Sequence, residues 1–291
     1  TNYSSSSRYS MIWVYSPDKA YDDVTIRNCT IENTYGDGIY VSGYAEPVIE
    51  DNTIKNCGSS GVEIDTDGIL TNLSPVIRDN HIENNGYGIN SKGDDQYSLK
   101  PVIEGNTLSF NTYALAQENF SFPSYSGNTI SSNTFQTISV SGIINPAFFS
   151  TEFWPDVEGL GLAYYIVEDL TLDSNLKLTI PSGVVIKFAT KSNNFANYRM
   201  LVNGELDVQG TASDPVVFTS IHDDTYGGDS NGNGNATQPS NKDWGYIQFN
   251  SAPNVTNTFE HCIVRYGGYY STNYSSSRRY SMIWVYSPDK A

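Results

Sequence analysis

Basic residues and cysteines are both scarce in this 291-residue chain. Only 16 Lys and Arg stand against 32 Asp and Glu, which gives a formal net charge of −16. Nucleic acid is bound through clustered Lys and Arg, so this balance excludes a nucleic-acid partner and favours a soluble surface protein or one that takes up cations. Three cysteines, Cys29, Cys57 and Cys262, are too few for a disulfide framework and lack metal-ligand spacing. We expect them to be small buried residues.

Long apolar runs and a helix-like composition are also missing. The chain has no stretch that predicts a transmembrane helix, and it begins with no signal peptide or initiating Met, so Thr1 is expected to be a cut or processed end. Charged residues make up only 16% and glycines number 24, which disfavours a helical bundle and favours short strands joined by polar turns. Aromatic residues at 13% argue against disorder.

The two ends of the chain repeat each other. Residues 1–20 and 272–291 differ only where Ser7 is replaced by Arg278, at an offset of 272 − 1 = 271 residues. A duplication within one module and a tandem array both explain this repeat. We favour the array, because the copies lie at the extreme ends. We therefore predict that residues 272–291 begin a next unit, with further copies following head-to-tail in one chain.

A shorter repeat runs through residues 20–145. Its isoleucines Ile26, Ile49, Ile77 and Ile103 are 23, 28 and 26 residues apart, and a weaker fifth copy starts at Tyr125. Apolar residues alternate with polar ones in each copy, which predicts strands with one buried face. A period in the twenties without helical patterning predicts one coil of a β-solenoid per copy. The expected fold is all-β, with about ten coils per 271-residue unit and parallel strands about 4.8 Å apart.

Polar residues line up in columns when the coils are aligned, and we predict that they form structural ladders. Stacked amides satisfy one another and the turn backbone, while alternating charges attract across neighbouring strands. The predicted amide columns are Asn52, Asn80, Asn106 and Asn128, with Cys29 in the first coil, and Asn33, Asn56 and Asn84. The predicted charge columns are Arg27, Glu50, Arg78 and Glu104, and Glu32, Lys55 and Glu83.

The remaining chain divides around a break in the coil pattern. We expect β-helix coils over residues 1–144, a connecting loop over 145–164, and further coils over 165–271 with an acidic loop inserted at 222–243. Residues 272–291 belong to the next unit in this division.

Four motifs of the second half carry a family resemblance: LTIPSGVVIKF (178–188), VNGELDVQGTASDPVVFTS (202–220), DWGYIQF (243–249) and FEHCIVRYGG (259–268). They resemble the right-handed parallel β-helix modules of secreted and surface proteins of bacteria and archaea. The first half resembles the coil repeats of the pectate-lyase-like and periplasmic NosD-type groups. The resemblance implies a right-handed coil and an extracellular or cell-surface location. It leaves function open, because lyases, adhesins and inert spacers share this scaffold.

The acidic loop contains half of a calcium-loop pattern. Asp229, Asn231 and Asn233 place side-chain oxygens at alternate positions before Gly234, but Ser240 stands where a bidentate Glu is expected. The missing carboxylate is assigned to Asp223, Asp224 or Asp243. We expect a structural Ca²⁺ ion that orders this loop.

Tyrosines near both ends form a candidate contact surface. They are Tyr3, Tyr9, Tyr15, Tyr269 and Tyr270, around Ser-rich segments. Exposed Tyr binds sugars and other proteins, so lateral self-association or glycan binding is predicted there. The alternative is one more strand beside a solvated loop.

No cluster of residues in the sequence predicts catalysis. The glycosidase pattern needs a carboxyl pair, and no pair is singled out. His81, His222 and His261 lie in no catalytic motif. The sequence therefore predicts a structural, non-enzymatic element of an extracellular fibre, stalk or surface layer. The alternatives are a carbohydrate-binding surface adhesin and a polysaccharide lyase or hydrolase.

Overall fold

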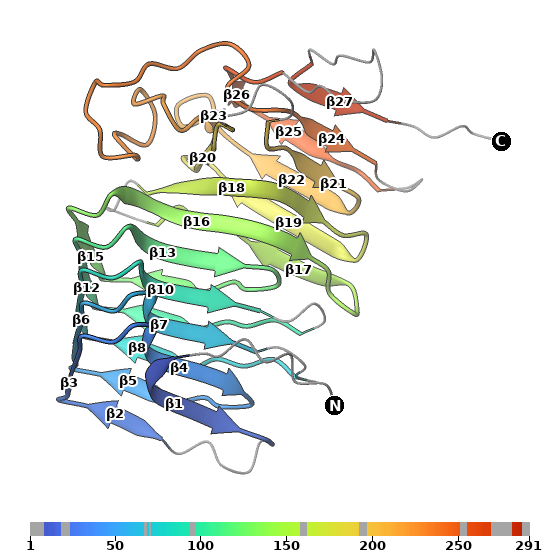
Figure 1. The fold of residues 1–291 in the computed structure, drawn as a ribbon. Helices are drawn as coiled ribbons and strands as arrows, with labels where there is room; N and C mark the ends of the chain where they lie inside the picture. The colour runs from blue at the N-terminus through green and yellow to red at the C-terminus, as the bar shows by residue number, and fades with distance from the viewer. Residues whose placement is uncertain are drawn as a thin grey trace.

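The computed structural model describes residues 9–18, 24–66, 69, 71–93, 97–157, 162–191, 197–250, 255–268 and 281–286. Within these ranges the regular elements are 27 β-strands, with no helix long or apolar enough to cross a membrane. The strands stack as successive coils, so the predicted all-β parallel solenoid is confirmed (Figure 1).

One sheet of 13 strands runs the length of the solenoid, and we call it the long sheet. Its strands are β1 (Ser10–Ser16), β4 (Asp37–Gly43), β7 (Ser60–Asp65), β10 (Tyr87–Lys92), β13 (Tyr113–Glu118), β16 (Phe135–Ile144), β18 (Ala163–Leu172), β20 (Val185–Phe188), β21 (Met200–Val202), β23 (Val216–Ser220), β24 (Ile247–Phe249), β26 (Cys262–Val264) and β27 (Ile283–Val285).

Three shorter sheets close the coil. The first corner sheet holds β2 (Thr25–Arg27), β5 (Val48–Glu50), β8 (Val76–Arg78), β11 (Val102–Glu104) and β14 (Ser124–Ser126). The second corner sheet holds β3 (Thr30–Glu32), β6 (Thr53–Lys55), β9 (His81–Glu83), β12 (Thr107–Ser109) and β15 (Thr129–Ser131). The fourth sheet holds β17 (Ser150–Phe153), β19 (Leu176–Pro181), β22 (Glu205–Gln209) and β25 (Thr258–Glu260).

In the first half each coil has three sides, and the alternating sequence explains its core. Ile49 lies opposite Ile26 in the preceding coil and Ile77 in the following one. Successive side chains of a strand point to opposite faces, so this column faces the interior. Ile49 and Ile77 have no exposed surface, and Ile54 and Ile82 form the matching buried column of the second corner sheet.

Beyond β16 the coil has two sides, the long sheet and the fourth sheet. The expected connecting loop at residues 145–164 is wrong in part, since it contains β17, which pairs with β19. Glu152 and Trp154 are buried there, and the Trp154 ring stacks on Tyr164 at 4.8 Å. The alternating aromatic and polar residues of this segment form a strand, so the solenoid continues across it.

The coil count is lower than predicted. Seven strands of the long sheet, from β1 through β4, β7, β10, β13 and β16 to β18, are uninterrupted, which gives about seven regular turns. After β18 each level is split, because β20 pairs with residues 164–166 and β21 with residues 170–172 of the same strand. The chain leaves the sheet between the two halves, after β20, β23 and β26, and returns to it at β21, β24 and β27. The excursion between β23 and β24 is the acidic loop that we expected at 222–243, whereas the excursion between β20 and β21 uses residues that we assigned to coils.

The two copies of the end repeat pair with neighbouring coils on opposite sides, one with the coil before it and the other with the coil after it. In β27, Ile283 lies beside Ile247 of the preceding coil. In β1, Ile12 lies beside Ile39 of the following coil. Ile283 and Ile12 are equivalent, since 283 − 271 = 12. One and the same segment therefore fits both the end of one unit and the start of the next.

Candidate functional site

The first amide column forms as predicted, at the corner between the two corner sheets. Asn52, Asn80 and Asn106 each donate from Nδ2 to the Oδ1 of the next asparagine, at 3.0–3.1 Å, and the column ends at Asn128. Each Oδ1 also accepts a backbone N–H of the preceding coil, including that of Cys29 at 3.0 Å. A backbone N–H at this corner of each of four coils is thereby satisfied.

The second predicted column is displaced by one residue. Asn33, Asn56 and Asn84 lie at the corner before the long sheet, but they are bend residues with φ of 61°, 56° and 56°. Asn56 donates to Asn33 at 3.2 Å on the exposed surface. Asparagine tolerates this left-handed backbone better than most residues, which explains its use there.

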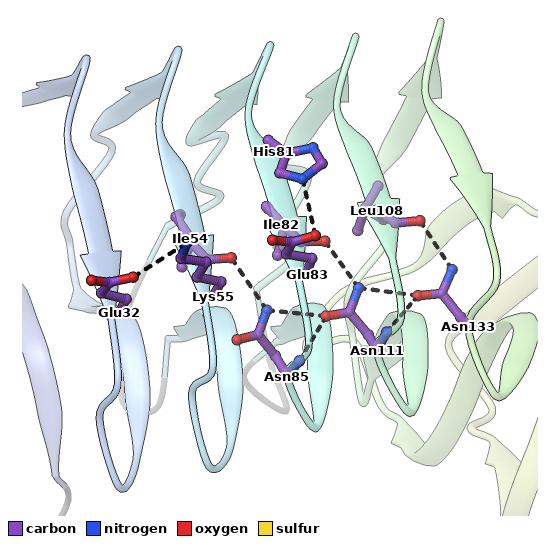
Figure 2. A network of polar contacts seen from close by, with 10 residues as sticks. All are labelled: Glu32, Ile54, Lys55, His81, Ile82, Glu83, Asn85, Leu108, Asn111 and Asn133. Carbon is purple, nitrogen blue, oxygen red and sulfur yellow. Dashed lines mark hydrogen bonds and ion pairs between the residues drawn. The ribbon is translucent and has the colours of Figure 1, made fainter.

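The buried column of this corner consists of the residues that follow the bend. Asn85 donates to Asn111 and Asn111 to Asn133, both at 3.0 Å, and each also donates to a carbonyl of the preceding coil (Figure 2). Cys57 heads the column, with its backbone N–H 2.9 Å from Asn85 Oδ1. Both corners thus share one design, a left-handed residue followed by a laddered asparagine.

The cysteines occupy the same position in this design. Cys29, Cys57 and Cys262 each follow a residue with positive φ, and each thiol donates to the carbonyl two residues earlier. Asn80 Nδ2 makes the same contact with Arg78. All three cysteines are free, Cys29 is exposed and only Cys57 is buried, so the expectation of three buried cysteines is wrong for Cys29. Burial raises the pKa of the Cys57 thiol to about 11, which leaves it unreactive.

The charge columns lie in the predicted register, and two of their pairs are close. Glu50 lies beside Arg27 and Arg78, and Arg78 lies beside Glu104. Arg78 contacts Glu50 at 2.6 Å. In the other column, Lys55 Nζ is 3.3 Å from Glu32, whereas Glu83 contacts His81 at 3.2 Å. These partly exposed pairs are screened by solvent and contribute little to stability.

The acidic loop leaves the end of β23 as a long excursion (Figure 1), and its Ser230 carbonyl accepts the backbone N–H of Gln136 on β16 at 3.0 Å. Both oxygens of Asp229 accept backbone N–H groups, those of Asn233 and Gly234 at 3.1 and 2.7 Å. Asn231 donates to the Ile221 carbonyl at 3.2 Å. The alternating oxygens of the motif therefore hold the turn itself together.

The other acidic residues of the loop are spread over its base. Asp223 is buried, where it accepts from Thr219 at 2.6 Å and lies 3.5 Å from Arg265. Asp243 accepts from Ser220 at 2.6 Å, whereas one buried oxygen of Asp224 has no hydrogen-bond partner. Across the described ranges, no three His, Cys, Asp or Glu side chains come together as a metal site. Calcium binding stays a prediction, and a fall in melting temperature on EDTA treatment would support it.

A buried lysine holds this loop against the sheet, and we did not predict its role from the sequence. Lys187 on β20 has no exposed surface, and its Nζ donates to the Gly228 carbonyl at 2.7 Å. Burial lowers the pKa of this ammonium to about 8, against the opposing effect of Asp224, Asp223 and Asp229. Lys187 thus places a positive charge under the acidic loop.

We predict that Lys187→Met loosens the loop without unfolding the coils. The Gly228 carbonyl loses its donor and the loop carboxylates lose a counter-charge, which costs about 1–3 kcal/mol of local stability. Hydrogen exchange at residues 223–234 should accelerate about tenfold or more. Lys177→Met, which removes a partly exposed pair with Glu205, is the control. Equal protection in the two variants would contradict this role of Lys187.

A pocket of ≈ 890 Å³ opens at the corner before the long sheet, in the first coils. We call it the acidic pocket, since its lining contains Asp37 and Glu63 and no Lys or Arg. Tyr9 and Tyr35, whose rings meet edge-to-face at 5.7 Å, are 60% and 85% exposed and also line it. Its remaining lining residues are Thr34, Gly36, Asn56, Cys57, Gly58, Ser59 and Asn84.

Glu63 lies in the middle of β7, between the core residues Val62 and Ile64, so its side chain points out of the solenoid. It accepts from Ser60 Oγ at 2.7 Å and from Asn90 Nδ2 at 3.3 Å. Burial raises the pKa of Glu63 to about 7, and the negative charges of Asp37 and Glu118 add to this shift.

We predict that Glu63 makes stability fall as the pH rises. Its folded-state pKa lies above the unfolded value of 4.5, so the folded chain binds more protons between pH 4.5 and 7. The stabilisation by the neutral carboxyl is complete below pH 4.5 and is lost as the pH rises through 7, at most about 3 kcal/mol. Glu63→Gln should remove this slope in urea unfolding measured at pH 4.5, 6 and 8. An unchanged slope would contradict the prediction.

The structure describes two of the five tyrosines of the predicted contact surface. Tyr9 lies at the acidic pocket, and Tyr15 is 50% exposed on β1, with its ring 5.9 Å from that of Trp13. Trp13 in turn is 64% exposed and lies 6.1 Å from Tyr40. Tyr3, Tyr269 and Tyr270 lie outside the described residues.

The pocket acids were not predicted, although a signal for them exists. Glu63 and Asn90 occupy the same register on neighbouring strands, and each lies between two inward-facing residues. Alternation alone therefore places them side by side on the outer face.

Parallel coils with laddered corners define a right-handed parallel β-helix protein. Residues 2–145 match the family model described as a right handed beta helix region. Residues 160–284 match the model described as a pectate-lyase like beta helix domain. The chain therefore belongs to the parallel β-helix families, as its motifs suggested. No curated protein and no solved structure matches it.

Proposed function

We propose that the chain is a structural element of an extracellular or cell-surface fibre, stalk or layer, built from tandem β-helix units. The observation that carries this proposal is the double fit of the end repeat, whose two copies pair with the coil before it and the coil after it. Superposing β27 of one unit on β1 of the next continues the long sheet without a break. A column of isoleucines, from Ile247 through Ile283 to Ile39, then runs across the junction.

The corner design supports a load-carrying role. Each asparagine column links successive coils through side chains that are themselves buried and hydrogen-bonded. Such ladders stabilise stacking along the axis and repeat wherever the coil repeats. A solenoid of this kind is stiff in the direction in which a fibre is extended.

The denatured mass of the native, unfragmented protein tests this proposal. We expect a mass far above 32.1 kDa, with partial proteolysis giving a ladder spaced by one 271-residue unit. A native mass near 32.1 kDa would contradict the tandem array and leave the end repeats as a duplication within one module.

Glycan binding is the second candidate, and the acidic pocket favours it. Two exposed tyrosine rings beside buried polar groups are a common arrangement for holding a sugar ring. The pocket lies on the first coils, so every unit of an array would carry one. A multivalent adhesin would follow from such a repeat.

A hydrolase is less well supported by the same geometry. Asn90 Nδ2 donates to Glu63 and Glu118 at 3.3 and 3.2 Å, so the amide lies between the two carboxyl groups. A glycosidase needs that space for the glycosidic bond or a water molecule. Release of reducing or unsaturated sugars from a polysaccharide would promote the enzymatic alternative.

A further inference from the structure

We propose that the acidic pocket binds a saccharide that carries an ammonium group, with Glu63 and Asp37 facing the ammonium and Tyr35 and Tyr9 facing the sugar ring. This inference rests on the glycan-binding candidate and adds the chemical class of the ligand. It separates the pocket from sites that take uronic acids, whose carboxylates require basic partners.

The charge of the pocket carries the first part of the argument. Asp37 accepts the backbone N–H of Ser60 at 3.0 Å, and Glu63 accepts the Ser60 hydroxyl. Within the described residues, neither carboxyl group has a Lys, Arg or His partner within 4 Å. A ligand cation supplies the missing counter-charge. A polyuronate would instead add negative charge to a chain of net charge −16.

Asn90 supplies a second, independent observation. It is 5% exposed, and its Oδ1 has no hydrogen-bond donor, while its Nδ2 is shared by Glu63 and Glu118. A buried acceptor without a donor is costly to keep. Asn90 is not part of the pocket lining but contacts the lining residue Glu63, so a donor that reaches Glu63 comes close to its Oδ1. An ammonium group, with three N–H donors, serves Glu63 and Asn90 together.

The two tyrosines favour a sugar as the ligand over a simple metal cation. Tyr35 exposes 85% of its surface, and Tyr9 meets its ring at nearly a right angle, 87°. A hydrated cation gains little from two such rings, whereas a pyranose packs its C–H face on one of them. The volume of ≈ 890 Å³ lies within the range of small-molecule pockets, about 300–1,000 Å³.

Calorimetric titration of the whole chain at pH 7 tests the proposal with three tetrasaccharides. They are a β-1,4-linked glucosamine oligomer, its N-acetylated form and an oligogalacturonate. We expect the glucosamine oligomer to bind at least about tenfold more tightly than the acetylated one, because only its ammonium group offers charged donors to the carboxylates. The oligogalacturonate should show no binding.

Variants locate the site. Glu63→Gln should abolish the preference for the amino sugar. Glu50→Gln, which removes the same charge from a partly exposed charge column outside the pocket, should leave it unchanged. Tyr35→Ala, at a position too exposed to affect folding, should weaken both binding sugars about threefold or more.

The outcomes separate the inference from the candidate on which it rests. Equal binding of the amino and acetylated sugars overturns the ammonium assignment and leaves glycan binding intact. Tight binding of the galacturonate overturns it as well. If Glu63→Gln and Glu50→Gln reduce the preference for the amino sugar equally, the effect comes from net charge, and the ammonium assignment is overturned as well. If none of the three sugars binds, both the ammonium assignment and the glycan-binding candidate are overturned, whether or not the chain binds Ca²⁺.

Discussion

Replacing Asn106 by alanine is expected to lower the free energy of unfolding by about 2–6 kcal/mol. Asn106 has no exposed surface, and its side chain makes four hydrogen bonds. It donates to the Ile77 carbonyl at 2.8 Å and accepts from the backbone N–H of Asn80 at 3.0 Å. Without the side chain these two backbone groups lose that partner inside the solenoid, where no water replaces it. Each loss costs about 1–3 kcal/mol.

The matched control is Asn56→Gly, because it separates the two kinds of corner asparagine. Asn56 is exposed, has φ of 56° and makes one side-chain contact along its column. Glycine adopts this backbone conformation readily, so we expect a change within about 0.5 kcal/mol. Urea unfolding of both variants measures the difference. Similar losses in the two would contradict the assignment of the buried column as the main stabilising one.

Trp244→Ala is expected to cost about 3–5 kcal/mol, the usual range for removing a buried tryptophan. Trp244 ends the longest excursion and has no exposed surface. Its ring stacks on Phe188 at 4.2 Å, and its Nε1 donates to the Arg265 carbonyl at 2.9 Å. Loss of the ring leaves a cavity where the excursion returns to the core, so β24 and the coils after it lose their anchor.

Trp13→Ala is the control for the same residue type. Its ring is 64% exposed and contacts neighbouring rings and Ser42, so the expected cost is below about 1 kcal/mol. Guanidinium unfolding followed by circular dichroism compares the two variants. A loss below 1 kcal/mol in Trp244→Ala would mean that the excursion is not anchored through this ring.

The sequence predicted the first half well, since its coil period is short and regular. Ile26, Ile49, Ile77 and Ile103 recur with the coil, and their alternation with polar residues fixes which face is buried. The amide column through Asn80 follows from the same alignment. The second column was misplaced by one residue at Asn84-Asn85, because two adjacent asparagines satisfy the pattern equally and backbone conformation alone distinguishes them.

The remaining features depend on contacts between segments far apart in the chain. Lys187 meets Gly228 across 41 residues, and no local pattern relates the two. The acidic pocket combines Tyr9, Tyr35 and Glu63 from three successive coils. Excursions after β18 also hide the coil count, since a loop and a coil of similar length look alike in sequence.

The length of a chain that holds two consecutive units tests the continuous solenoid most directly. Along the long sheet, β1 and β27 are nine pairing steps apart, which at about 4.8 Å per step gives ~43 Å of axial rise per unit. We expect electron microscopy of such a two-unit chain to show one straight rod that is ~43 Å longer than the single unit. A bend or gap at the junction, or two particles joined by a linker, would contradict the account.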